Sequence, residues 1–94
     1  MSTEKPQIEK ESEVDELTLV EREHEIILYN DDVNTFDFVI DMLVNVCEHT
    51  PIQAEQCAII VHFKGKCGVK TGTFDELKPR CTKLLEAGLS AEII

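Results

Sequence analysis

The feature that most restricts the fold of this chain is a change in hydrophobic spacing between residues 24 and 48. HEIILYN, residues 24–30, is a continuous apolar run, short enough for a buried strand, that ends in turn residues. Beyond the turn, apolar residues recur at three- and four-residue intervals, which predicts an amphipathic helix over about residues 35–48. A strand that leads directly into a helix predicts a fold in which both element types share one core. The apolar residues of this helix are Phe36, Val39, Ile40, Leu43, Val44 and Cys47.

Capping residues mark where the first two helices begin. Asn34 is expected to cap the first helix, with Asp37 three residues later completing a capping-box-like arrangement. Thr50 is expected to cap the second helix, with Pro51 at its first position and Gln53 reaching back to the cap. This second helix runs to about residue 63 and leaves little polar surface, so we expect it to be central to the core. Its apolar residues are Ile52, Cys57, Ile60, Val61 and Phe63.

Residues 64–94 add two strands and a third helix. KGKCGVKTG, residues 64–72, predicts a turn and a short strand, because glycines interrupt it at three positions. TFDE, residues 73–76, is a further capping box, and Gly88 is expected to end the helix that follows. Pro79 within that helix is expected to kink or restart it, and LSAEII predicts a closing strand. The apolar stripe of the third helix is Leu77, Cys81, Leu84 and Leu85.

These elements predict an α+β fold of the order β-α-α-β-α-β, with the helices packed on one face of a three-stranded sheet. The chain has 94 residues, of which 43% are hydrophobic, and this suits one small domain, placed at residues 24–94. Residues 1–23 lack aromatics and are rich in Glu, Lys and Ser, which predicts a disordered acidic N-terminal extension. An apolar group within it is a candidate for docking on a partner or on the domain: Val14, Leu17, Leu19 and Val20.

Charge is distributed unevenly along the chain. The formal net charge is −10, which argues against nucleic acid and anionic membranes as partners, because both favour basic surfaces. Residues 26–63 hold six acidic side chains and no Lys or Arg, whereas residues 64–94 hold four acidic and six basic ones. The first half of the domain is therefore expected to favour a cationic ligand.

Cysteine spacing and the lack of catalytic motifs limit the chemistry. The four cysteines show no C-x-x-C spacing and lie in apolar patterns, and no signal-like or membrane-spanning segment is seen, which predicts a reduced, cytoplasmic setting. No Gly-rich phosphate loop or zinc spacing is present, so we expect no cofactor, no metal and no catalytic residue. The alternative from the enzyme class is a thiol-dependent activity at Cys57 or Cys67.

The polar turn after the first strand permits two interpretations. Asn30, Asp31 and Asp32 are ordinary turn residues, and from the local sequence alone a structural role is the more common one. His62, alone on an apolar helix, is likewise more often a satisfied, partly buried histidine than a ligand. These residues gain a functional interpretation only when they are considered with the rest of the chain.

Taken together, the chain resembles the ClpS family of adaptors for ATP-dependent Clp proteases. The resemblance covers about residues 24–94 and rests on EIILYNDD, TFDFVIDML, the helix around Ala54 and VHFKGK at residues 61–66. It implies an adaptor that binds the free N-terminal bulky residue of N-degron substrates, namely Leu, Phe, Tyr or Trp. It also implies delivery of these substrates to a Clp AAA+ unfoldase, ClpA- or ClpC-like, that is engaged partly through the N-terminal extension.

Matching positions of the family imply roles for individual residues. Asn30, Asp31 and His62 would accept hydrogen bonds from the substrate α-amine, a cation with three donors. Asp32 and Asn34 are candidates for contact with the substrate backbone. The pocket for the first side chain would be formed by Phe36, Val39, Met42, Ala58 and Val61.

The chain departs from the family pattern at several places. Phe36 lies where many relatives have Met, and Ala58 lies where some have the larger Met, so the pocket is expected to be deeper or wider here. The usual KAxCGV run is shortened to KCGV. The binding-module alternative is a protein-docking domain like the C-terminal domain of the ribosomal stalk protein, which shares the topology and would show no N-terminal residue specificity.

Overall fold

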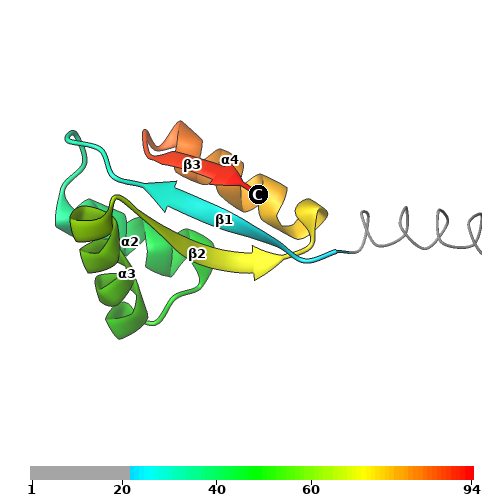
Figure 1. Ribbon diagram of the computed structural model, residues 1–94, viewed down its shortest axis with the longest axis horizontal. Coiled ribbons are helices and arrows are strands. Elements are labelled where there is room, and N and C mark those ends of the chain that lie inside the picture. The colour runs from blue at the N-terminus through cyan, green and yellow to red at the C-terminus, as the bar shows by residue number, and fades with distance from the viewer. Residues whose placement is uncertain (1–21) are drawn as a thin grey trace, which may run out of the picture.

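A three-stranded antiparallel sheet with the order β2-β1-β3 forms the centre of the fold (Figure 1). The computed structural model describes residues 22–94. The elements follow one another as β1 (His24–Tyr29), α2 (Phe36–Cys47), α3 (Pro51–Lys64), β2 (Lys66–Gly72), α4 (Phe74–Glu86) and β3 (Ser90–Ile93). This order confirms the predicted β-α-α-β-α-β fold. Residues 1–21, which hold most of the predicted N-terminal extension, lie outside the described residues.

The central strand β1 buries one face only. Ile26 and Leu28 are almost completely buried, whereas Ile27 and Tyr29, which alternate with them, are half-buried. Since successive side chains of a strand point to opposite faces, the core lies on the side of Ile26 and Leu28. Leu43 of α2 and Leu77 and Leu84 of α4 join that core.

Helix α3 differs most from its prediction. The expectation that it is central to the core is wrong for most of its apolar residues, since Ile52 is 72% exposed and Phe63 is 78% exposed. The buried residues are Ala54, Ala58 and Val61, which recur at helical spacing on one face. Two of these three side chains are small, so the helix backbone can lie close to its neighbours while its larger side chains face outward.

The helix termini confirm two predicted caps and correct a third. Thr50 with Gln53, and Thr73 with Glu76, form the expected capping boxes, and Pro51 begins α3. The predicted cap of α2 is wrong: Thr35, not Asn34, accepts the hydrogen bond from the backbone N–H of Phe38, at 3.1 Å. Asn34 lies one residue before this cap, and its Nδ2 is bonded to Asp31 and Gly88, as described below.

Helix α4 continues through its proline. It is a single helix from Phe74 to Glu86, so the prediction that Pro79 restarts it is wrong. Pro79 and Asp75, whose carbonyl loses its helical donor, are both exposed, and exposed backbone groups tolerate such a loss more easily than buried ones. Gly88 follows the helix with φ of 93°, a left-handed conformation that favours glycine.

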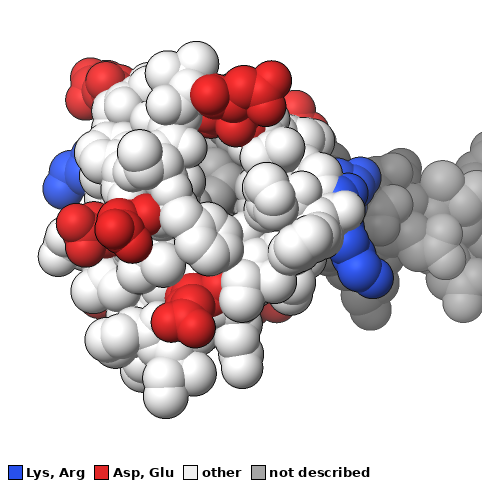
Figure 2. Space-filling view, turned by 90° about the vertical axis from the view of Figure 1, so that its left-hand side faces the viewer, with Lys and Arg blue, Asp and Glu red and all other residues white. Residues whose placement is uncertain are grey.

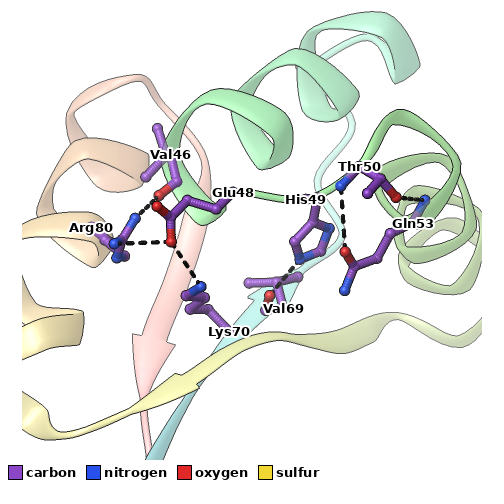
Figure 3. A network of polar contacts seen from close by, with 8 residues as sticks. All are labelled: Val46, Glu48, His49, Thr50, Gln53, Val69, Lys70 and Arg80. Atoms are coloured by element: carbon purple, nitrogen blue, oxygen red, sulfur yellow. Dashed lines mark hydrogen bonds and ion pairs between the residues drawn. The ribbon is translucent and has the colours of Figure 1, made fainter.

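The junction between α2 and α3 is fixed by polar contacts (Figure 3). Arg80 of α4 donates to the Val46 carbonyl at 2.6 Å and to the Glu48 carboxylate at 3.3 Å, and Lys70 of β2 donates to the same carboxylate at 3.1 Å. The buried His49 ring is hydrogen-bonded to the carbonyl of Val69 in β2. These contacts tie the start of α3 to the sheet and so fix the position of the helix that carries His62.

Candidate functional site

A cavity of about 570 Å³ opens at the end of the molecule where β1 runs into α2. Its walls come from the end of β1, the loop before α2, the first turn of α2, the second half of α3 and the turn between α4 and β3. Figure 2 faces this end and shows a hollow among uncharged atoms, with acidic groups around it and basic groups toward the edges. The cavity is lined by Leu28, Tyr29, Asn30, Asp31, Asp32, Asn34, Phe36, Val39, Ala58, Ile59, Val61, His62, Phe63 and Leu89.

The carboxylate of Asp31 organises the loop between β1 and α2. Its Oδ1 accepts hydrogen bonds from the backbone N–H groups of Val33 and Asn34, both at 2.9 Å, and from Nδ2 of Asn34 at 3.1 Å. Within residues 22–94, its Oδ2 accepts a single hydrogen bond, from Nδ2 of Asn34 at 3.0 Å. A carboxylate oxygen can accept a second hydrogen bond, so Oδ2 is the atom of Asp31 that can still bind a cation.

Hydrogen bonding keeps Asp31 ionised. Partial burial raises the pKa of its carboxyl group, but the hydrogen bonds from the backbone and side chain of Asn34 and from the backbone of Val33 outweigh burial. The net pKa of Asp31 is therefore below its ordinary value. Since hydrogen bonds to the charged form favour that form, Asp31 is a fixed negative charge at the cavity at neutral pH.

Asn30 and His62 line the same cavity as Asp31, and their side chains are available to a ligand. The backbone N–H of Asn30 donates to the carbonyl of Gly65 at 2.9 Å, which joins the loop to the end of α3. The His62 ring lies edge-on to Phe36 and Phe63, with ring centroids 6.4 and 4.9 Å apart. Within residues 22–94, neither the Asn30 nor the His62 side chain has a hydrogen-bond partner. Both are exposed and line the cavity, so their acceptor atoms can meet a donor on a ligand.

The rest of the cavity is apolar. Ala58 and Val61 of α3 are 2% and 6% exposed and form part of its wall together with Leu28 and Leu89. Phe36 is 44% exposed and lies at the start of α2, beside His62. The arrangement therefore combines an acidic, acceptor-rich group with an apolar wall, which suits a ligand that carries a cation next to an apolar group.

The structure brings together nine of the ten residues selected from the sequence. Met42 is the exception, because it does not line the cavity and packs, half-buried, against the core. Five lining residues were not selected: Leu28, Tyr29, Ile59, Phe63 and Leu89. Leu28 and Tyr29 directly precede the polar turn, Ile59 lies one helical turn before His62 and Phe63 directly follows it, so position along the chain could have indicated them. Leu89 had no such signal, because only the pairing of β3 beside β1 brings it to the cavity.

The cysteines of the chain lie away from the candidate site. All four cysteines are free, and none of them lines the cavity. Burial, followed by a hydrogen bond with Cys67, raises the pKa of the Cys57 thiol to about 12.

In the described part of the chain, no three His, Cys, Asp or Glu side chains are grouped so that they could hold a metal ion. The helices between residues 22 and 94 are also too short or too polar to cross a membrane.

The sequence of this chain matches a known protein family. A family model described as "ATP-dependent Clp protease adaptor protein ClpS" matches residues 20–92. The chain belongs to the ClpS family. The ClpS adapter of Nitratidesulfovibrio vulgaris is 40% identical over 55 residues, covering 56% of this chain and 55% of that relative. The ClpS adapter of Acetivibrio thermocellus is 37% identical over 73 residues, covering 78% of this chain and 72% of the relative.

A solved ClpS structure has the same fold. It is that of Agrobacterium tumefaciens ClpS2 bound to L-phenylalaninamide, with a TM-score of 0.67 over 77% of this chain and 96% of that one. Sequence identity is 20%, so this likeness supports the fold alone. The match to the N. vulgaris ClpS relative spans only about half of that protein's length.

Proposed function

We propose that this chain is a non-enzymatic adaptor that binds the free N-terminal residue of protein substrates and delivers them to a Clp AAA+ unfoldase. The first residue would be bulky and apolar: Leu, Phe, Tyr or Trp. The observation that carries the proposal is the group of acceptors at Asn30, Asp31 and His62 beside an apolar cavity of about 570 Å³.

The chemistry of an N-terminal residue matches this arrangement. Its α-ammonium group carries one positive charge and three donors, and the side chain begins one bond away from the carbon that holds the amine. Asp31 supplies the compensating charge, while Asn30 and His62 supply further acceptors. Because residues 26–63 contain no Lys or Arg, no base in that segment competes with an ammonium group for the carboxylate.

Two further observations support the proposal. ClpS2 of A. tumefaciens was solved bound to L-phenylalaninamide, which has a free α-amine, a bulky apolar side chain and an amide where a peptide would continue. The absence of cysteine from the cavity lining and the raised pKa of Cys57 argue against the thiol-dependent alternative, because the thiolate is the nucleophilic form.

The direct test is a set of binding titrations with peptides that differ only in their first residue. Peptides starting with Leu, Phe, Tyr or Trp should bind, and otherwise identical peptides starting with Gly or Asp should not. The variant Ala58→Met should weaken binding of the Trp-starting peptide more than that of the Leu-starting peptide, because the larger side chain fills part of the cavity. Equal affinity for every first residue would instead favour a docking domain without N-terminal specificity.

Delivery requires a separate assay. A Clp unfoldase and its peptidase should degrade a Phe-starting protein faster when this chain is present. Removing residues 1–20 should leave peptide binding nearly unchanged, because a disordered polar extension of the kind expected from the sequence adds few packed contacts, and should abolish the acceleration. If the shortened chain accelerates degradation as well as the intact one, the extension has no part in delivery.

A further inference from the structure

The side chain of Asn34 makes three polar contacts, and one of them reaches a segment that is distant in sequence. Its Nδ2 contacts three acceptors: the two carboxylate oxygens of Asp31, at 3.1 and 3.0 Å, and the carbonyl of Gly88, at 3.0 Å. Because all three neighbours are acceptors, the atom that faces them must be the nitrogen and not the oxygen of the amide. The two N–H groups of Asn34 are therefore already in use, and only its Oδ1 is left for a contact with substrate.

The contact with Gly88 joins segments that are 54 residues apart in sequence. Gly88 lies in the turn between α4 and β3, has φ of 93°, and directly precedes Leu89. Leu89 is 4% exposed and forms part of the apolar wall of the cavity. One amide nitrogen thus contacts both the charged group of the site and the turn that carries one of its apolar residues.

We infer that Asn34 is a positioning residue, which holds the Asp31 carboxylate and the turn with Leu89 at a fixed separation. This inference rests on the proposed function. An N-terminal residue presents its ammonium group and its side chain from one carbon atom, so the two halves of the site must be correctly spaced to bind both at once. Asn34 sets this spacing without needing to contact the substrate itself.

Loss of the Asn34 side chain should have a defined and partial effect. In Asn34→Ala, Oδ1 of Asp31 keeps its bonds from the backbone N–H groups of Val33 and residue 34, so the carboxylate stays in the loop. Oδ2 loses its only partner and becomes free to rotate away from the ammonium group. A peptide with a free amine should therefore bind roughly 10-fold more weakly, since one charge-assisted bond is impaired.

The readout that separates positioning from general destabilisation is the ratio of two affinities. These are the affinities of a Phe-starting peptide with a free amine and of the same peptide with an acetylated amine. A general loosening of the cavity would weaken both peptides and leave the ratio unchanged, whereas misplacement of Asp31 weakens mainly the free-amine peptide. The ratio should fall several-fold in Asn34→Ala and stay at its wild-type value in Asn45→Ala, which removes an exposed asparagine from α2.

A near-isosteric variant adds a pH profile. Asn34→Asp removes both donors and places a second carboxylate against Asp31, so protonation of the pair should begin at a higher pH than in the wild type. Binding of the free-amine peptide should accordingly be lost at higher pH as the solution is acidified. The other titratable groups that line the cavity are Asp32 of the same loop, His62 of α3 and Tyr29 of β1, and they are the same in both proteins.

The outcomes distinguish this inference from the function on which it rests. If the wild type binds both peptides equally, the proposed function itself fails, and the inference fails with it. If the wild type prefers the free amine and Asn34→Ala keeps the full wild-type ratio, positioning by Asn34 is overturned while the proposed function stands. Should Asn34→Ala not fold, Asn34→Asp provides the same comparison, and an unchanged ratio and pH profile in that variant would overturn the inference equally.

Discussion

Two regions of this molecule each contain an acidic and a histidine side chain, yet the regions differ in what those side chains contact. At the α2–α3 junction, Glu48 is paired with Lys70 and Arg80, and Nε2 of His49 is bonded to a backbone carbonyl. Near the loop between β1 and α2, Asp31 has no basic partner within the described residues, and His62 has no hydrogen-bond partner there. Acidic composition alone therefore does not mark a cation site.

The difference between the partners of Glu48 and Asp31 arises from the second half of the chain. Lys70 of β2 and Arg80 of α4 both lie at the α2–α3 junction, where they neutralise Glu48 (Figure 3). The segments that reach Asp31 bring only uncharged groups, namely the Gly88 carbonyl through Asn34 and the apolar side chain of Leu89 nearby. In the described part of the chain the charge of Asp31 therefore has no basic partner, which supports the proposed amine site.

The largest effect that this comparison predicts comes from removing the charge of the ligand. N-acetylation of a Phe-starting peptide should weaken binding by about 1.5–3 kcal/mol for each charge-assisted hydrogen bond lost. The acceptors of Asn30, Asp31 and His62 would face a neutral amide with a single donor. Isothermal titration of both peptides measures the difference. Equal affinities for the free and the acetylated peptide would show that these acceptors do not bind an amine.

Substituting Asp31 and Glu48 in turn should show which of the two regions binds the peptide. Asp31→Ala should weaken binding of a free-amine peptide by about 1.5–3 kcal/mol, because it removes the charge that compensates the ammonium group. Glu48→Ala removes an equally acidic side chain from the other loop and should leave the affinity unchanged. Melting curves would verify that both variants fold. A similar loss of affinity in both would mean that overall charge, and not a local site, attracts the peptide.

The sequence predicted the order of the elements better than it predicted the cavity. Capping boxes at Thr50 and Thr73 depend on residues three positions apart, so local spacing is sufficient to find them. The bond from Asn34 to Gly88 spans 54 residues, and Thr35, not the predicted Asn34, caps α2. Long-range contacts of this kind, like the approach of Leu89 to the cavity, leave no local pattern in the sequence.

The exposed side of α3 illustrates the same limit. An apolar periodicity does not distinguish the buried face of a helix from an exposed apolar face when both are present. The small residues Ala54 and Ala58 face the core, whereas Ile52 and Phe63 are mostly exposed. Predicting this required the shape of the neighbouring elements, which sequence spacing does not provide.

A smaller effect is expected at Phe36, where the polar loop ends and α2 begins. An aromatic ring beside His62 should crowd a substrate side chain that branches at its β-carbon, so Ile and Val should bind less well than Leu. Leu and Ile have equal numbers of carbon atoms, and a misplaced methyl group is worth roughly 1–3 kcal/mol. Phe36→Ala should therefore lower the Leu-to-Ile affinity ratio. A wild-type ratio near one would place the control of specificity elsewhere.

The smallest effect is expected on the melting temperature when Glu48 is substituted. The pH dependence of this effect tests whether Glu48 acts through its ion pairs. The hydrogen bond from Lys70, and then the charges of Arg80 and Lys70, hold the pKa of Glu48 below its ordinary value in the folded protein. A carboxyl group whose pKa is lowered by folding stabilises the fold above its unfolded pKa, and this contribution is lost as the pH falls through the folded pKa.

Glu48→Gln should therefore lower the melting temperature slightly near pH 7, by an amount that is typical of an exposed ion pair. Wild type and variant should converge once the pH falls below the folded pKa of Glu48, where the glutamate is protonated and, like glutamine, uncharged. High salt at pH 7 should reduce the difference in the same way, because it screens the charges. The affinity for a free-amine peptide at pH 7 should be the same in both proteins. A difference in melting temperature that persists at low pH would show that Glu48 acts through packing at the junction and not through its charge.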